Sequence, residues 1–150
     1  MDKSAEGLLG TPFSLDIERS KIREFARAVR ASHPDFESER PVVPPTFLTS
    51  TFHVESDVPG ANPWAALKVD LTRGLHAEQE YVFFGPPPRA GARLTCQSRI
   101  DTIYEKEGKR GGTLTFAVMV TEFRDERGRL VAEARMTGVE TGVNPEGKKP

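Results

Sequence analysis

The sequence predicts an α+β domain in which helices pack on one face of an antiparallel sheet. An apolar stripe with helical spacing lies within residues 18–31, and two adjacent prolines precede a mostly apolar run that ends at residue 49. Long segments of alternating apolar and polar residues fill the second half of the chain. Alternating strands are apolar on one side only, so the buried side of the sheet needs helices to cover it.

Length, charge and cysteine content limit the possible domain organisation and the possible partners. A chain of 150 residues is long enough for one domain with its own core, and the net charge of -1 is spread over interleaved acidic and basic residues. We therefore expect no nucleic acid and no membrane as partner. The single cysteine, Cys96, excludes an internal disulfide and suits a reducing cytoplasm. The predicted organisation is a flexible segment 1–9, a single domain 10–142 and a disordered tail 143–150.

The first elements are an extended arm and a helix. Residues 11–17 alternate apolar and polar, which is typical of a short strand. A helix is expected from about residue 18 to 31, with Asp16 or Ser20 as its N-cap and a charged, solvated outer face. Its buried stripe has helical spacing and consists of Ile22, Phe25, Ala26 and Val29.

A second, buried helix is expected at about residues 45–53, starting at Pro45 or Thr46, because proline is tolerated in the first helical turn. The charged segment 33–40 before it is predicted to be a loop. The stretch 55–71 is irregular apart from a possible turn at 64–67, and irregular stretches of this length are often binding loops or lids. Trp64 either contacts a ligand there or covers an edge of the core.

Four strands are expected at residues 75–84, 92–105, 113–124 and 129–140, in the order of a meander. Glycine-containing turns at 107–112 and 125–128 predict tight hairpins. A curved antiparallel sheet wrapped around a long helix is the hot-dog arrangement, and its open edge favours dimerisation. One face of the strand 92–105 is predicted to contain Leu94, Cys96, Ser98, Ile100, Thr102 and Tyr104.

The chain contains no glycine-rich nucleotide loop, paired-cysteine motif or zinc-protease motif, so neither a cofactor nor a metal is predicted. Cys96 lies in a strand among apolar neighbours and is expected to be an inert buried thiol. His76, Glu78 and Glu80 are predicted to share one strand face. That set suits either general acid–base chemistry or the polar side of an edge strand.

Four segments of the chain form a recognisable series: Ile22-Arg23-Glu24-Phe25-Ala26, Val43-Pro44-Pro45-Thr46-Phe47-Leu48, Leu75-His76-Ala77-Glu78-Gln79-Glu80-Tyr81 and Pro88-Arg89-Ala90-Gly91. Taken in this order they resemble the N-terminal half of the MaoC dehydratase family, and the resemblance covers about residues 10–142. That family includes the non-catalytic subunits of mycobacterial (3R)-hydroxyacyl-ACP dehydratases.

Catalytic hydratases of this fold contain the motif Asp-x-Asn-Pro-x-His before the central helix. If Pro34 matches the proline of that motif, Ala31 and Phe36 stand where the aspartate and histidine are needed. The resemblance therefore implies a scaffold subunit that binds an acyl-CoA or acyl-ACP thioester and completes a double hot dog with a catalytic MaoC-like subunit. The substrate-binding residues that it implies are Pro45, Thr46, Phe47, Trp64 and Leu67.

Two other functions remain open. One is a self-sufficient homodimeric hydratase or thioesterase that uses either His33 with Asp35 or His76 with Glu78. The other is a hot-dog module that binds acyl groups or partners without turnover. Three arginines either meet the phosphates of the carrier or belong to a solvated face: Arg89, Arg93 and Arg99.

Overall fold

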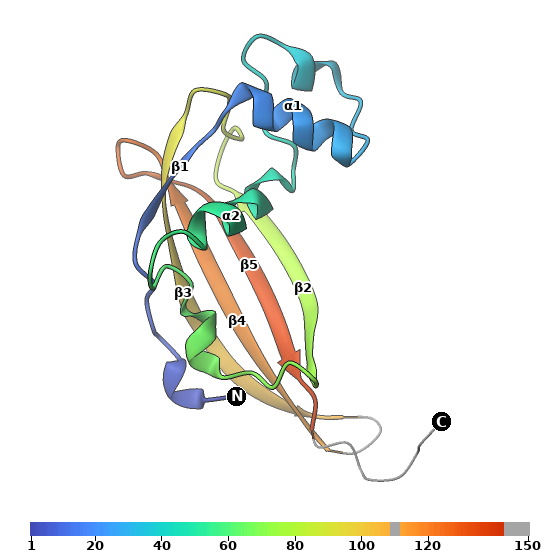
Figure 1. The fold of residues 1–150 in the computed structure, drawn as a ribbon, viewed down its shortest axis with the longest axis vertical. Helices are drawn as coiled ribbons and strands as arrows, with labels where there is room; N and C mark the ends of the chain where they lie inside the picture. Colours follow the sequence, from blue (N-terminus) through green and yellow to red (C-terminus); the bar gives the residue numbers. More distant parts are fainter. Residues whose placement is uncertain (109–111, 143–150) are drawn as a thin grey trace.

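A five-stranded antiparallel sheet forms the body of the structure, a computed structural model that describes residues 1–108 and 112–142. The strand order is β1-β3-β4-β5-β2 (Figure 1). The predicted strands are all present, as β1 (Phe13–Asp16), β2 (Gly74–Phe83), β3 (Arg93–Glu107), β4 (Thr113–Arg124) and β5 (Leu130–Glu140). The tip of the β3–β4 turn and the predicted disordered tail lie outside the described residues.

The sheet departs from the predicted meander at β2. This strand pairs with β5 at one edge, whereas β3 pairs with the arm β1 at the other edge. The reason is the connection 84–92, which includes Pro86-Pro87-Pro88 and is no tight hairpin. The Val43 N–H donates to the Pro88 carbonyl, so this loop pairs with residues 42–43 and leads the chain to the opposite side of the sheet, where β3 lies beside β1. The β3–β4 and β4–β5 pairings are as predicted.

The first helix is shorter than the sequence predicts, and the central helix is shifted along the chain. The first, α1, spans Arg19–Ala28, and neither Asp16 nor Ser20 caps it: Glu18 is the N-cap residue, without a side-chain hydrogen bond. The Asp16 carboxylate instead pairs with Arg93. The central helix is a 3-10 turn at Phe47–Ser50 followed by α2, Thr51–Glu55, so it has about the predicted length but begins after Pro45 and Thr46 and is only partly α-helical. No helix in the described ranges is long and apolar enough to cross a membrane.

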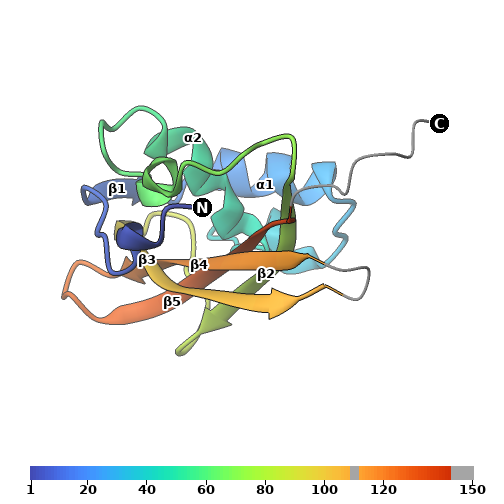
Figure 2. The same cartoon turned by 90° about the horizontal axis from the view of Figure 1, so that it is seen from below.

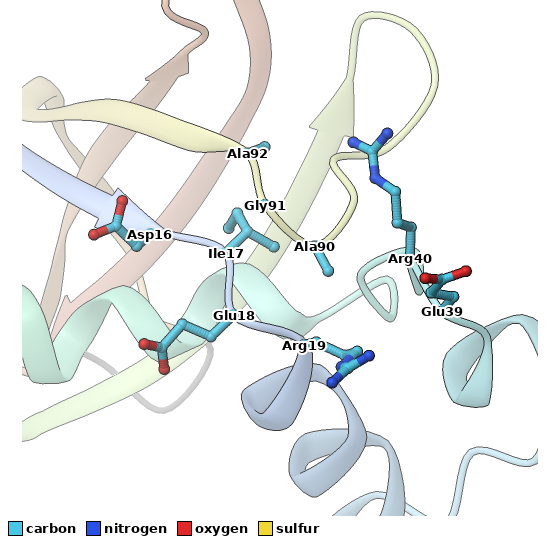
Figure 3. A pocket seen from close by; sticks show the side chains of 9 residues that line it. All are labelled: Asp16, Ile17, Glu18, Arg19, Glu39, Arg40, Ala90, Gly91 and Ala92. Atoms are coloured by element: carbon cyan, nitrogen blue, oxygen red, sulfur yellow. The ribbon is translucent and has the colours of Figure 1, made fainter.

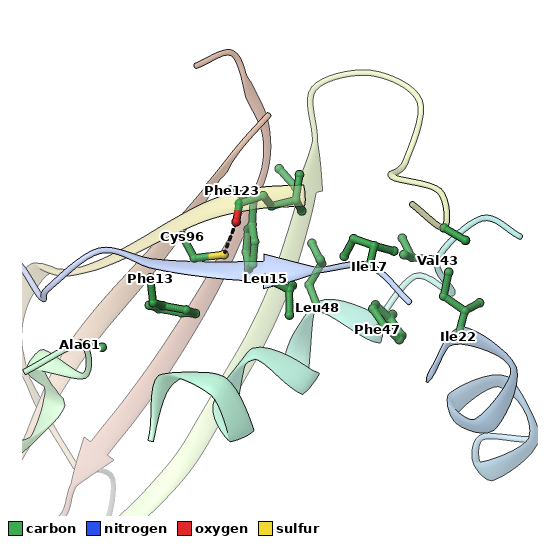
Figure 4. Packing of buried hydrophobic residues seen from close by; sticks show 13 residues of the cluster. Phe13, Leu15, Ile17, Ile22, Val43, Phe47, Leu48, Ala61, Cys96 and Phe123 are labelled. Carbon is green, nitrogen blue, oxygen red and sulfur yellow. Dashed lines mark hydrogen bonds between the residues drawn. The ribbon is translucent and has the colours of Figure 1, made fainter. Parts of the chain in front are cut away.

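Helices and irregular segments cover one face of the sheet, here called the helical face, and leave the opposite, open face uncovered (Figure 2). The larger core cluster lies between α1, α2, β1 and the sheet (Figure 4). Apolar burial of this kind is the main favourable contribution to folding. Among its largest fully buried side chains are Ile17, Ile22, Leu48, Leu94 and Phe123.

A β-bulge in β3 reverses part of the predicted face assignment. The register shifts between Ile100 and Thr102, so the residues beyond it exchange faces. Ile103 therefore packs against the second core cluster on the helical face. Tyr104, predicted to share a face with Leu94, stacks on Phe116 at a ring distance of 5.0 Å instead.

Within the N-terminal segment 1–9, for which the sequence predicts flexibility, residues 7–9 lie along β3. The Gly7 N–H donates to the Ile100 carbonyl over 2.8 Å, and the Ile100 N–H donates to the Leu8 carbonyl over 3.0 Å. Ala5 is buried in the second core cluster. These contacts extend the β3 edge beyond the four paired residues of β1.

A buried carboxyl group fixes the end of α2 to the sheet. Ser98 Oγ of β3 lies 2.9 Å from Glu55 Oε1 and 2.8 Å from Thr121 Oγ1 of β4. Glu55 is only 7% exposed, and burial raises its pKa above the ordinary value of 4.5 because the charged form loses hydration. The hydrogen bond with Ser98 offsets part of this shift.

We expect Phe123→Ala to lower the free energy of unfolding by about 3 to 5 kcal/mol, because Phe123 is fully buried and its loss leaves a cavity. Urea denaturation followed by circular dichroism measures this difference. Leu71→Ala is the control, since Leu71 is 86% exposed and its truncation is expected to change stability by less than about 0.5 kcal/mol. Equal effects of the two substitutions would contradict the described core.

Glu55→Gln is expected to gain stability relative to the wild type as pH rises. A carboxyl group with a raised folded pKa stabilises the fold fully only below its unfolded pKa, and this contribution is lost as pH rises through the folded pKa. Glutamine keeps an acceptor for Ser98 and does not ionise. Urea unfolding between about pH 4 and pH 8 measures the difference, with Glu78→Gln as the exposed control. A pH-independent difference between Glu55→Gln and wild type is incompatible with a buried, titrating Glu55.

Candidate functional site

His33 and Asp35 lie in a 3-10 turn, Pro34–Glu37, between α1 and the central helix. Arg89 holds the Asp35 carboxylate with two hydrogen bonds of 3.1 and 2.8 Å, which lower the pKa of Asp35. His33 Nδ1 accepts the Asp35 backbone N–H, so the imidazole caps the turn. The fold thus brings these residues together as a turn and an ion pair. Phe36 is buried, and its ring lies 5.7 Å from that of His33.

His76 and Glu78 lie on opposite faces of β2, which corrects their predicted common face. The register shifts between them: His76 pairs with Gly138, whereas Glu78 pairs with Thr137. Paired residues of antiparallel strands share a face and successive residues alternate. His76 is therefore on the helical face and Glu78 on the open face. His76 Nε2 lies 3.1 Å from the Glu78 backbone carbonyl oxygen.

The residues expected at the start of the central helix separate into two environments. Pro45 and Thr46 are exposed, whereas Phe47 is buried and its ring packs edge-on against Phe25 at 5.5 Å. Phe47 forms part of a groove of about 580 Å³ between α1, β1 and the central helix. The floor of that groove is apolar, and its rim is charged, with Asp16, Glu18, Lys21, Glu24 and His53.

Trp64 and Leu67 belong to the 3-10 turn Pro63–Leu67, which begins at Asn62. The Asn62 side chain accepts the Trp64 N–H over 2.9 Å and so fixes the turn. Leu67 is fully buried in the second core cluster. Trp64 packs against the same cluster and also borders a cavity of about 200 Å³, called here the Trp64 pocket, between the irregular segment and the β2–β5 edge.

The three arginines proposed for phosphate contact are all paired with carboxylates. Arg89 pairs with Asp35, and Arg93 pairs with Asp16. Arg99 contacts Asp101 and Glu122 on the open face. Their charges are therefore largely balanced within the chain.

A further open groove of about 650 Å³ lies where β1 leads into α1 (Figure 3). Arg19 and Arg40 border it, and so do the carboxylates of Asp16, Glu18 and Glu39. Acidic groups beside the two arginines offset their attraction for an anion. The mixed charge favours no single class of ligand.

The sequence alone did not identify Met136 and Gly138, which border the Trp64 pocket from β5. Gly138 offered one signal, since a glycine inside a strand often marks the close approach of another group. Glu55 was also missed, because a single charged residue before an irregular stretch resembles any solvated position.

The chemistry available to the chain by itself is limited. Within the residues that the structure describes, none of the three histidines is hydrogen-bonded to a carboxylate, and no group of three potential ligands is placed to hold a metal. Burial and the charge of Glu55 raise the pKa of Cys96 to about 12, so its thiol is a poor nucleophile.

Comparisons with known proteins agree with this fold. Residues 5–134 match the family described as FAS1-like, dehydratase domain region. A UPF0336 protein of Streptomyces griseus is 31% identical, covering 89% of this chain and 91% of that protein.

Two solved structures from Mycobacterium tuberculosis are also similar. A C-terminally truncated HadBC (3R-hydroxyacyl-ACP dehydratase) complex matches with a TM-score of 0.70 and 26% identity, over 93% of this chain and 99% of the matched chain. The ChsH1-ChsH2 complex matches in fold, with a TM-score of 0.68 and 13% identity over 99% and 92% of the two chains. The predicted hot-dog fold is confirmed, and the chain belongs to the FAS1-like dehydratase domain family, which is MaoC-like.

Proposed function

We propose that this chain is the non-catalytic, acyl-thioester-binding subunit of an (R)-specific enoyl hydratase or 3-hydroxyacyl dehydratase, acting with a catalytic MaoC-like subunit in the cytoplasm. The observation that carries the proposal is the missing acid–base pair. Arg89 engages Asp35, and a bulge separates His76 from Glu78. Such chemistry needs the acid and base within hydrogen-bond reach of one substrate, so the catalytic pair is assigned to a second polypeptide.

The edge strand β2 supports a partner subunit. Residues 75–80 are exposed along it, and β5 pairs with it on one side only. The Phe84 N–H donates to the Val131 carbonyl, and directions alternate along an antiparallel strand. The N–H groups of Gln79 and Tyr81 therefore point to the free edge and are available to another strand. The similar HadBC and ChsH1-ChsH2 structures are complexes.

The Trp64 pocket supports an acyl group as the bound part of the substrate. Its walls are mainly apolar, and it reaches the same edge strand through Leu75 and His76. A thioester held by a partner at this edge would have an apolar cavity within this chain for its acyl chain. Phe47 and its groove lie on the other side of α2, so the pocket and not the helix start is the proposed site.

The isolated chain is expected to hydrate crotonyl-CoA no faster than buffer, whereas co-expression with an adjacent gene product carrying Asp-x-Asn-Pro-x-His yields turnover. Loss of enoyl absorbance measures the rate. His33→Ala in this chain is the matched control and should leave turnover by the complex within about twofold, because His33 only caps its turn. Turnover by the isolated chain at an enzymatic rate would sink the scaffold assignment and favour the homodimeric enzyme.

Gln79→Pro is expected to prevent assembly with the catalytic subunit. Proline removes an N–H that points away from β5 and places its ring at the free edge, so the β2–β5 ladder keeps its hydrogen bonds. Gln79→Ala keeps the N–H and is the control. Co-purification and size-exclusion chromatography measure assembly, and circular dichroism checks the fold. A complex that forms equally well with both variants would rule out β2 as the docking edge.

A further inference from the structure

The Trp64 pocket is the most apolar of the cavities described for the chain. Its walls come from the irregular segment, from the β2–β5 edge and from the N-terminal residue, and include Met1, Trp64, Val69, Leu71, Leu75 and Met136. His76 is the only ionisable side chain among its described lining residues. A cavity with so few polar groups does not hold water well and favours an apolar occupant.

Gly138 and Trp64 fit each other so closely that no side chain could stand between them. A Cβ atom at Gly138 would lie 2.5 Å from Cζ2 and 2.6 Å from Cη2 of the indole. Such distances are far below van der Waals contact, so a methyl group there forces the indole to move. The absence of a side chain at Gly138 therefore decides where this wall of the pocket stands.

The turn holds Trp64 on its other side. Its backbone N–H is bound by Asn62, and Pro63 before it has a restricted backbone angle. Leu67, at the end of the same turn, is fully buried in the second core cluster. The indole is thus held between this turn and the backbone of Gly138, and its fixed position sets the depth of the pocket.

The pocket opens toward the free edge of the sheet. Leu75 lies on β2 and is 63% exposed, and Leu71 before the strand is 86% exposed. Both also border the pocket, so an apolar path leads from the edge into it. A chain entering from this edge exchanges water for apolar contacts along its length.

We propose that the Trp64 pocket takes the apolar end of an unbranched aliphatic chain, and that Gly138, by seating the indole of Trp64, sets the longest chain that fits. The identification of that chain as an acyl group rests on the proposed function, whereas the cavity and its limit rest on geometry. The volume of about 200 Å³ exceeds the cavity of about 150 Å³ that holds a benzene molecule, so about six to eight carbons fit.

The test uses Trp64 as its own reporter, since it is the only tryptophan of the chain. The isolated protein is titrated with straight-chain alcohols from butanol to decanol while tryptophan emission is recorded. Each buried methylene is expected to tighten binding about fourfold until the pocket is full, after which further carbons add nothing. A flat response along the series, or no change in emission, overturns the proposal.

Two substitutions test the limit itself. Gly138→Ala is expected to weaken binding of the longest alcohol that fits the wild type by at least about tenfold, because the indole is displaced. Gly85→Ala is the control, since an added Cβ meets nothing within 4 Å there. Equal binding by the two variants contradicts the role of Gly138.

Trp64→Phe provides a second test of the chain-length limit if Gly138→Ala fails to fold. The smaller ring withdraws one wall, so calorimetry should show a limit at least one carbon longer than that of the wild type. An unchanged limit overturns the proposal. If alcohols bind with the expected length limit but the complex fails to hydrate crotonyl-CoA, the pocket proposal is supported and the proposed function is not. If the complex hydrates crotonyl-CoA but the alcohols show no length limit, the proposed function is supported and the pocket proposal is overturned.

Discussion

The contact of Glu55 with Ser98, backed by Thr121, is the constraint on which the helical face depends. A five-residue α-helix has little stability of its own, and apolar packing alone does not fix its direction. A buried hydrogen bond does, because it requires particular atoms to meet. The irregular segment starts directly after Glu55, so the same contact decides where the chain sets out toward Trp64. The short helix is therefore positioned by a polar group within an apolar layer.

Local patterns predicted the hairpins well and the order of strands poorly. The strands β3, β4 and β5 follow from alternation and from glycine-containing turns, which act over a few residues. The place of β2 depends on a loop that pairs with residues 42–43, far away in the sequence. Bulges were equally invisible: one shift beside Thr102 moved Tyr104 to the open face, and another separated His76 from Glu78. Alternation of apolar and polar residues does not reveal where an inserted residue shifts the register and exchanges the two faces of a strand.

The site shows the same division between local and distant information. Trp64 could be singled out, because a lone tryptophan in an irregular stretch is conspicuous in the sequence. The close contact between Trp64 and Gly138 could not be predicted from the sequence, since it joins a turn to a strand that is distant along the chain. Leu67, one 3-10 turn further on, lies on the same side of the turn as Trp64 and is buried in the second core cluster, against which Trp64 also packs. The absence of the catalytic motif was visible in the sequence. The ion pair between Asp35 and Arg89 was not, because it joins residues that only the fold brings together.

The exposed strand β2 has two carboxylates on its open face, Glu78 and Glu80, on either side of Gln79. If two copies paired antiparallel about Gln79, Glu78 of each copy would stand opposite Glu80 of the other. Like charges directly opposite each other destabilise a strand pair. Pairing of two copies in that register is therefore disfavoured, whereas a strand with basic residues at the two positions would pair more favourably.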